Sequence, residues 1–324
     1  MSIFDDASVL ITGGTGSFGK RFVRALLETG SPRRVAVFSR DELKQFEMQQ
    51  AHPNEPRLRF FIGDVRDAAR LERAFHGVDY VIHAAALKQV PAAEYNPFEA
   101  VKTNVHGAQN VIDAAIDQGV RRVIALSTDK ACSPVNLYGA TKLVSDKLFI
   151  SGNSYAGGTA TRFAVVRYGN VVGSRGSIVP FFKELAATGR LPITDERMTR
   201  FWITLDQGVR FVMDSVERMS GGELFVPKIP SMRVVDLAKA MAPEAQLDMV
   251  GIRPGEKIHE EMINISDART TLDMGDYFVI QPQFPWWRGD HLEGSQVPEG
   301  FAYASDSNDR WLSVDDLRRM VADA

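Results

Sequence analysis

Short runs of apolar and β-branched residues alternate with helix-length amphipathic segments from residue 7 to residue 168 of this 324-residue chain. Six runs are candidate strands: SVLIT (8–12), RVAVF (34–38), LRFFI (58–62), VDYVIHA (78–84), RVIALS (122–127) and FAVVRY (163–168). Most of them are apolar throughout, as strands are when helices cover both faces of their sheet. The alternation therefore predicts an α/β fold built on a doubly wound parallel sheet.

Between these runs, five segments have helical periodicity and contain no proline: 18–28, 41–52, 68–75, 99–118 and 137–150. After residue 168 the alternation stops, and the chain becomes richer in glycine, proline and isolated charges. We expect residues 1–170 to form a nucleotide-binding domain and residues 171–324 a smaller, irregular α/β domain that binds the substrate. Segment 204–226, which starts with helical periodicity, is expected to return to the first domain.

The composition excludes several classes of partner. The chain has 38 Lys and Arg against 41 Asp and Glu, and this net charge of -3 supplies no basic field for nucleic acid or an anionic membrane. No apolar stretch approaches the roughly 20 residues of a membrane span. The single cysteine, Cys132, allows no internal disulfide, which favours a reducing compartment. We expect a cytoplasmic protein with a small-molecule substrate, and no metal, because His259-Glu260-Glu261 lacks ligand spacing.

The first candidate strand runs directly into the glycine-rich turn TGGTGSFG (12–19), which opens the first predicted helix. Without Cβ atoms the turn can tighten, and its backbone can approach a pyrophosphate whose charge the amides at the helix N-terminus meet. The spacing is GxxGxxG rather than GxGxxG, but strand, turn and helix follow one another as a dinucleotide site requires. The pattern predicts a Rossmann-type cofactor site with contacts from Gly13, Thr15, Gly16, Ser17, Phe18 and Gly19.

The end of the second candidate strand separates NADP from NAD. An acidic residue there would hold the ribose 2′-hydroxyl and repel a 2′-phosphate. This chain instead has a hydroxyl and two cationic side chains: Ser39, Arg40 and Lys44. The pattern favours NADP, although the two cations could be only the solvated start of a helix, and Asp41 could cap that helix or reach a ribose. After the third strand, Asp64 and Val65 suit contacts with adenine, unless Asp64 caps the next helix.

The fifth candidate strand ends in STDK (127–130), and Tyr138 and Lys142 follow in the next predicted helix. Tyr and Lys four residues apart share one helix face, so we expect the ammonium to favour the phenolate and to lower the pKa of Tyr138 toward that of a general base. Thr128 is expected to orient the reacting oxygen. A tyrosine stacked on a surface lysine is the alternative, but the position at the carboxyl edge of the sheet favours catalysis.

These motifs resemble the extended short-chain dehydrogenase/reductases that act on nucleotide sugars, over nearly the whole chain. Four long segments resemble, more narrowly, the inverting UDP-N-acetylglucosamine 4,6-dehydratases: HAAALKQVPAAEYNPFEAVKTN (83–104), STDKACSPVNLYGATK (127–142), RYGNVVGSRGSIVPFF (167–182) and RPGEKIHEEM (253–262). The resemblance implies an NADP-dependent lyase that makes UDP-2-acetamido-2,6-dideoxy-β-L-arabino-hex-4-ulose for pseudaminic-acid-type sugars. It also implies a homo-oligomer formed through helices 99–118 and 137–150, and further cofactor contacts from Ala84, Ala85, Ala86, Asn104, Leu126, Ser127, Tyr138 and Lys142.

Asp129 and Lys130 favour a dehydratase over a 4-epimerase, because dehydration needs an acid and a base in addition to hydride transfer. We expect Tyr138 to take the C4 hydroxyl proton while hydride leaves C4 for the cofactor. Lys130, as a neutral amine, would then take the C5 proton, and protonated Asp129 would protonate the C6 hydroxyl as water leaves. Lys142 and the nicotinamide charge are expected to keep the pKa of Lys130 low.

The resemblance also implies a substrate-binding set: Lys88, Asn170, Val171, Arg200, Arg253 and Glu256. In it Arg253 would bind the diphosphate and Glu256 the uridine ribose, since arginine presents a planar fork to phosphate and a carboxylate accepts from a diol. Arg175 and Arg197 are further cationic candidates, and Trp286 and Trp287 a cap or subunit contact. The alternatives are a 4-epimerase, a 4,6-dehydratase for another UDP-hexose, and a catalytically silent NADP-binding protein.

Overall fold

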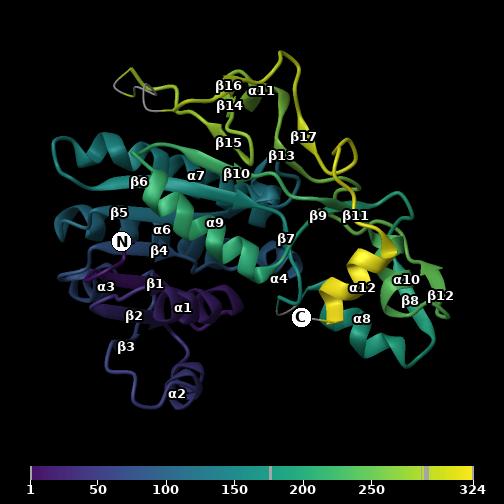
Figure 1. The fold of residues 1–324 in the computed structure, drawn as a ribbon, viewed down its shortest axis with the longest axis horizontal. Coiled ribbons are helices and arrows are strands. Elements are labelled where there is room, and N and C mark those ends of the chain that lie inside the picture. The colour runs from purple at the N-terminus through teal and green to yellow at the C-terminus, as the bar shows by residue number, and fades with distance from the viewer. Residues whose placement is uncertain (1, 175–176, 286, 288–291, 323–324) are drawn as a thin grey trace.

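The computed structural model describes residues 2–174, 177–285, 287 and 292–322. Its first six strands lie close to the predicted positions: β1 (Ser8–Thr12), β2 (Arg34–Ser39), β3 (Leu58–Ile62), β4 (Tyr80–His83), β5 (Arg122–Thr128) and β6 (Arg162–Tyr168). They pair in parallel in the order β3-β2-β1-β4-β5-β6, with helices on both faces (Figure 1). The predicted doubly wound parallel fold is confirmed. The strand order reverses between β1 and β4, which is where such folds bind ligands.

The helices that connect these strands are α1 (Ser17–Thr29), α2 (Glu42–Gln50), α3 (Ala68–Phe75), α4 (Val90–Tyr95), α5 (Pro97–Val101), η1 (Lys102–His106), α6 (Gly107–Asp117), η2 (Asp129–Ala131) and α7 (Leu137–Ala156). The helix predicted at 99–118 is interrupted by η1, a π-helical turn. A Cβ on Gly107, at the end of that turn, would lie 2.7 Å from Val65 Cγ2, so glycine permits this close approach. Helix α7 continues past residue 150 and ends before Gly157, whose φ is +54°.

Two later parts of the chain join the same sheet. Helix α9 (Leu205–Arg218) starts with a capping box between Thr204 and Gln207, and β10 (Leu224–Pro227) pairs in parallel with β6. Strands β14 (Thr271–Asp273), β15 (Tyr277–Ile280) and β16 (Ser295–Gln296) then extend the sheet with antiparallel pairing. We had placed segment 271–296 in the substrate-binding domain from the sequence, whereas the structure places its strands on the large sheet.

The smaller part of the molecule has its own core, which includes Phe182, Trp202, Met232, Leu237 and Leu317. Its elements are β7 (Asn170–Val171), α8 (Ile178–Ala186), β8 (Arg190–Ile193), β9 (Thr199–Ile203), β11 (Ser231–Arg233), α10 (Val234–Met241), β12 (Gln246–Met249) and α12 (Val314–Ala322). Three further elements, β13 (Glu261–Ile263), α11 (Ile265–Ala268) and β17 (Tyr303–Ala304), pack their buried side chains into the core of the large sheet. The strands form three small sheets, β11-β9-β7, β12-β8 and β13-β17. None of the helices in the described ranges has the length and apolarity to cross a bilayer.

Candidate active site

The glycine-rich turn after β1 lies directly against the segment that follows β4. Gly13 has a φ of +67°, and a Cβ there would lie 2.8 Å from the Ala85 nitrogen, so only glycine fits. A Cβ on Gly19 would lie 2.4 Å from Cα of Gly14, which lets α1 begin close to the turn. The N-cap of α1 is Gly16, which supplies no side chain to the first amides. The turn therefore has the shape that a dinucleotide pyrophosphate requires.

The two cations expected to meet a 2′-phosphate lie after β2, each beside a carboxylate. Arg40 is 3.4 Å from Asp64 and has 54% of its side chain exposed. Lys44 forms an ion pair with Asp41, and Asp41 also accepts from the Lys44 backbone N–H and so caps α2. Of the two roles left open for Asp41, the structure has the helix cap. Because exposed ion pairs are weak, a phosphate can compete for both cations.

Two residues predicted to contact the cofactor have partners within the protein. Asp64 binds Arg66 at 2.7 Å, and hydrogen bonds from Arg66 lower the pKa of this carboxyl despite its partial burial. The cap of α3 is Asp67, so the alternative role of Asp64 as a helix cap is wrong. The side chain of Asn104 bonds both backbone groups of Leu87, at 2.8 and 2.9 Å. Asn104 therefore holds the segment after β4 in place, and direct contacts with the cofactor stay a prediction for both residues.

The remaining residues predicted for the cofactor surround the same turn. Ser39 Oγ lies 2.7 Å from Thr15 Oγ1, which ties the end of β2 to the glycine turn. Phe18 stacks on Phe22 with ring centroids 5.6 Å apart. The other predicted residues lie near the carboxyl end of β5 or in the segments that follow β1, β3 and β4: Ser17, Val65, Ala84, Ala86, Leu126 and Ser127.

Tyr138, in the first turn of α7, is buried among the catalytic candidates. Burial raises the pKa of its hydroxyl to about 12, against the opposing effects of the Lys130 charge and a hydrogen bond with Thr128. The prediction that Lys142 lowers the pKa of Tyr138 is therefore wrong for this structure, in which the cation with that effect is Lys130. A shared helix face places Tyr138 and Lys142 near one another, but burial and the neighbouring loop decide the charge around the phenol.

Lys142 lies on α7 beside a buried polar network of α7 and β6. Burial lowers the pKa of Lys142, and the Asp146 carboxylate one helical turn further along opposes this effect. Asp146 accepts a hydrogen bond of 2.7 Å from Ser127 and lies 3.4 Å from the guanidinium of Arg167. Arg167 also lies 3.4 Å from Asp267. This network connects the end of β5 with α7, β6 and α11.

Lys130 lies between two buried carboxylates. Its Nζ is 3.0 Å from Asp129 Oδ1 and 3.2 Å from Glu260 Oε1. Burial alone would lower the pKa of Lys130, but the two carboxylates outweigh burial and raise it above the ordinary value. The prediction that Lys142 keeps Lys130 neutral is thus wrong, and the effect of the nicotinamide charge stays a prediction. Because an ammonium cannot accept a proton, Lys130 must pass one proton to a neighbour before it can act as a base.

The predicted substrate-binding residues lie on the smaller part of the molecule and beside β4. Asn170 Oδ1 is buried without a hydrogen-bond partner among the described residues, so it is available to a ligand. Arg253 and Glu256 share one turn, with an ion pair of 4.0 Å. Arg200 donates to the carbonyls of Thr199, Lys257 and Ile258, so its guanidinium links β9 to segment 257–260.

Other residues singled out from the sequence have these positions. Lys88 is an exposed residue, but nearby protein displaces water from its ammonium and so lowers its pKa. Val171 packs against the core of the large sheet. Arg197 pairs with Asp195 at 2.7 Å. The indole N–H of Trp287 donates to the carbonyl of Gly221, which lies between α9 and β10. Arg175 and Trp286 lie outside the described residues.

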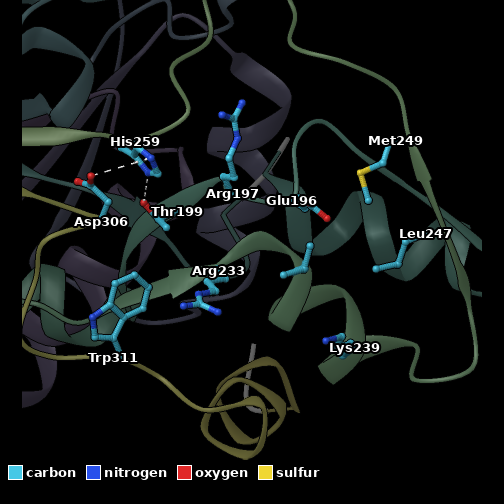
Figure 2. Close-up of a pocket in the computed structure, with 11 residues that line it drawn as sticks. Glu196, Arg197, Thr199, Arg233, Lys239, Leu247, Met249, His259, Asp306 and Trp311 are labelled. Carbon is cyan, nitrogen blue, oxygen red and sulfur yellow. Dashed lines mark hydrogen bonds and ion pairs between the residues drawn. The ribbon is translucent and has the colours of Figure 1, made fainter.

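A pocket of about 560 Å³ lies beside β9 and β11, and Figure 2 shows its lining. It is lined by Glu196, Arg197, Thr199, Arg233, Val235, Lys239, Leu247, Met249, His259, Asp306 and Trp311. Thr199 lines this pocket, and Arg200 follows it in β9, where neighbouring side chains point to opposite faces of the strand. The pocket therefore lies on the face of β9 opposite to Arg200.

Comparison with known proteins supplies independent evidence on this arrangement. A sequence model of the polysaccharide biosynthesis protein family matches residues 9–282. The chain belongs to this family. The inverting UDP-N-acetylglucosamine 4,6-dehydratase of Campylobacter jejuni serotype O:2 is 55% identical to it, over 98% of each chain. The resemblance to inverting dehydratases is thereby confirmed. Other members have a different name: the UDP-glucose 4-epimerase of Rickettsia canadensis is 43% identical, over 86% of this chain and 84% of its own length.

Solved structures share the fold. The X-ray structure of Pen from Bacillus thuringiensis matches with a TM-score of 0.91 and 37% identity, covering 99% of this chain and 98% of Pen. DesIV, the dTDP-glucose 4,6-dehydratase of Streptomyces venezuelae, matches with a TM-score of 0.70 and 26% identity, covering 78% of this chain and 86% of DesIV. That structure contains NAD.

Glu260 is the site residue that the sequence analysis missed. The sequence suggests it only as a metal ligand within His259-Glu260-Glu261, whereas its carboxylate contacts Lys130, the predicted base. Its position within RPGEKIHEEM, a segment that carried the family resemblance, was the one available signal.

Proposed function

We propose that this protein is an NADP-dependent hydro-lyase, a UDP-N-acetylglucosamine 4,6-dehydratase that inverts C5. The contact between Asp129 and Lys130, 3.0 Å apart and beside Tyr138, carries the proposal, because it supplies the acid and the base that dehydration needs. The 55% identity to an inverting dehydratase over nearly the full chain supports the substrate and the stereochemistry. A cytoplasmic homo-oligomer with contacts through α6 and α7 belongs to the same proposal.

The glycine turn supports a nicotinamide dinucleotide as the cofactor. Bound there, the dinucleotide would accept hydride from C4 of the sugar and return it to C6. Arg40 and Lys44 would hold the 2′-phosphate of NADP, because Arg40 lies exposed directly after β2, Lys44 lies half-buried in the first turn of α2, and no acidic residue ends that strand. Lys142, buried one turn from Tyr138, would bind the nicotinamide ribose.

The chain's own residues would carry the protons. Tyr138, as the phenolate, takes the proton of the C4 hydroxyl, with Thr128 orienting that hydroxyl. Lys130, as the amine, takes the C5 proton of the 4-keto sugar. Asp129, as the acid, protonates the C6 hydroxyl, which leaves as water. C5 then takes a proton from solvent on the opposite face, and Tyr138 returns its proton to solvent, which gives the inverted 6-deoxy-4-keto product and restores the phenolate.

The first test is the product of the purified protein. Incubation with UDP-N-acetylglucosamine and NADP is expected to give a 4-keto species that absorbs in alkali, with a mass lower by about 18 Da through loss of water and with inverted C5 by NMR. A product of unchanged mass would favour a 4-epimerase, the activity named for the Rickettsia relatives. No conversion of any UDP-hexose would indicate a silent dinucleotide-binding protein.

A second prediction concerns the choice of dinucleotide. Arg40→Ala is expected to weaken NADP binding about tenfold to a hundredfold, because a charge-assisted hydrogen bond contributes roughly 1.5–3 kcal/mol, and to leave NAD binding unchanged. Calorimetric titration of both dinucleotides measures this difference. Arg24→Ala, an exposed arginine in α1, is the matched control. An equal loss of affinity for both dinucleotides, or none for either, would contradict the assignment of Arg40 to the 2′-phosphate.

A further inference from the structure

Glu260 is a buried carboxylate for which the mechanism above has no role. Only 2% of the surface of Glu260 is exposed, and its Oε1 lies 3.2 Å from Lys130 Nζ and 3.9 Å from Arg200 Nε. The other oxygen, Oε2, is buried without a hydrogen-bond partner among the described residues. Burying a carboxylate is costly, and the two cations that face it offset part of that cost.

The backbone of Glu260 is held from the opposite side. Its N–H donates to Ser305 Oγ at 2.9 Å, and its carbonyl accepts from the Ser305 N–H at 2.8 Å. Ser305 Oγ lies 2.7 Å from Thr199 Oγ1, which is also bonded to His259 at 2.8 Å, as Figure 2 shows for Thr199 and His259. The carboxylate therefore has a fixed position relative to β9 and the catalytic turn.

Four charged or titratable groups face Lys130, each from a different element. They are Asp129 on η2, Arg200 on β9, Glu260 before β13, and Tyr138 on α7. The Lys130 charge lowers the pKa of Tyr138, and by reciprocity a phenolate at Tyr138 favours the ammonium of Lys130. Once Tyr138 is protonated, that support is lost, and the ammonium can release a proton more readily.

Between the two carboxylates, Asp129 is the one suited to receive that proton. Glu260 faces a second cation, Arg200, whereas the only cation within ion-pair distance of Asp129 in the described part of the chain is Lys130 itself. Glu260 thus keeps a cation beside it after Lys130 releases its proton, and Asp129, the nearer carboxylate at 3.0 Å against 3.2 Å, is positioned to accept that proton.

We propose that Glu260 sets the order of the proton transfers: its ion pair keeps Lys130 an ammonium while Tyr138 takes the C4 hydroxyl proton. This inference rests on the proposed function. After that step, an N–H bond of Lys130 breaks and an O–H bond of Asp129 forms, which produces the base and the acid together. The amine then takes the C5 proton, and Asp129 gives its proton to the C6 oxygen as the C–O bond breaks. Lys130 ends as the ammonium and Asp129 as the carboxylate, which is the starting state. Glu260 acts through Lys130 and is thus a positioning residue.

The first measurement is independent of catalysis. Trace acetylation with acetic anhydride at a series of pH values, followed by peptide mass spectrometry, reports the fraction of Lys130 that is a neutral amine. In the holoenzyme, Glu260→Gln is expected to increase acetylation of Lys130 about tenfold or more at a given pH, because loss of an opposite charge within 4 Å lowers a lysine pKa by about one unit or more. Glu261→Gln, the same change at the next residue, is the matched control and is expected to leave the acetylation unchanged.

The second measurement follows the first chemical step. The formation of reduced dinucleotide in a single turnover with UDP-N-acetylglucosamine is recorded against pH. This step needs Lys130 as the ammonium, so its rate falls as the pH rises and Lys130 loses its proton. Glu260 raises the pKa of Lys130, and Glu260→Gln is therefore expected to move this fall in rate to a lower pH than in the parental enzyme. Glu260→Asp keeps the charge and is expected to retain the parental pH profile, which a purely structural role would not predict.

The outcomes separate the two proposals. Parental acetylation and a parental pH profile in a folded Glu260→Gln variant overturn the role of Glu260. If that variant does not fold, Glu260→Asp decides the matter, because a pH profile shifted as far as one unit despite the retained charge would also overturn it. A parental enzyme that dehydrates no UDP-sugar overturns the proposed function, whatever the acetylation of Lys130 shows.

Discussion

Lys130→Ala is expected to reduce exchange of the substrate C5 proton with solvent deuterium by about 10²–10⁴-fold, the range that a positioned general base contributes. Reduction of the dinucleotide by hydride from C4 is expected to persist. Its rate is expected to be lower, because Lys130 also stabilises the Tyr138 phenolate. Mass spectrometry and NMR of substrate recovered from deuterium oxide measure the exchange. Exchange at the parental rate would remove Lys130 from the C5 step.

The alanine change also leaves two buried carboxylates, Asp129 and Glu260, without their shared cation. Lys130→Arg avoids this problem, because a guanidinium keeps the positive charge but is not deprotonated in proteins. It is expected to lose C5 exchange as fully as the alanine variant while keeping more of the C4 oxidation. Lys147→Ala, an exposed lysine on α7, serves as the matched control. Retained exchange in Lys130→Arg would show that the base is another residue.

Periodicity predicted the central parallel strands well because they are buried and their apolar runs are continuous. SVLIT coincides with the fully buried β1, LRFFI coincides with the partly exposed edge strand β3, and Gly13 lies where a Cβ would collide with the backbone of Ala85. Strands β14, β15 and β16 are short, and they join the large sheet through the pairing of β15 with β10, which is far away in the sequence. No local pattern could indicate that pairing.

The charges around the catalytic groups were the least predictable feature. The sequence suggests that Lys142 keeps the pKa of Lys130 low, but the carboxylates of Asp129 and of Glu260, 130 positions further along the chain, lie within 3.2 Å of its Nζ and together raise that pKa. Similarly, helical spacing paired Tyr138 with Lys142, while the charge that acts on the phenol comes from the turn after β5. Motifs identify which residue types are present, and tertiary packing decides their protonation states.

Asp146→Ala is expected to lower the free energy of unfolding by about 3–5 kcal/mol, because removal of one partner from a buried ion pair leaves the other charge uncompensated. The side chains of Asp146 and Arg167 are 2% and 3% exposed, and the remaining partner of Arg167, Asp267, is 3.4 Å away and more exposed. Ser127 would also lose its acceptor. Urea unfolding of the variant and the parental protein measures the difference, and Asp113→Ala, an exposed aspartate on α6, is the control.

The double variant Asp146→Leu with Arg167→Met tests whether the uncompensated charge is the cause. If it is, replacement of both partners by apolar side chains of similar volume is expected to recover most of the lost stability. Activity is expected to stay low in the double variant, because Asp146 also opposes the fall of the Lys142 pKa, so recovery of stability without recovery of activity would separate the two roles. A double variant as unstable as Asp146→Ala would instead assign the loss to packing around Ser127 and α7.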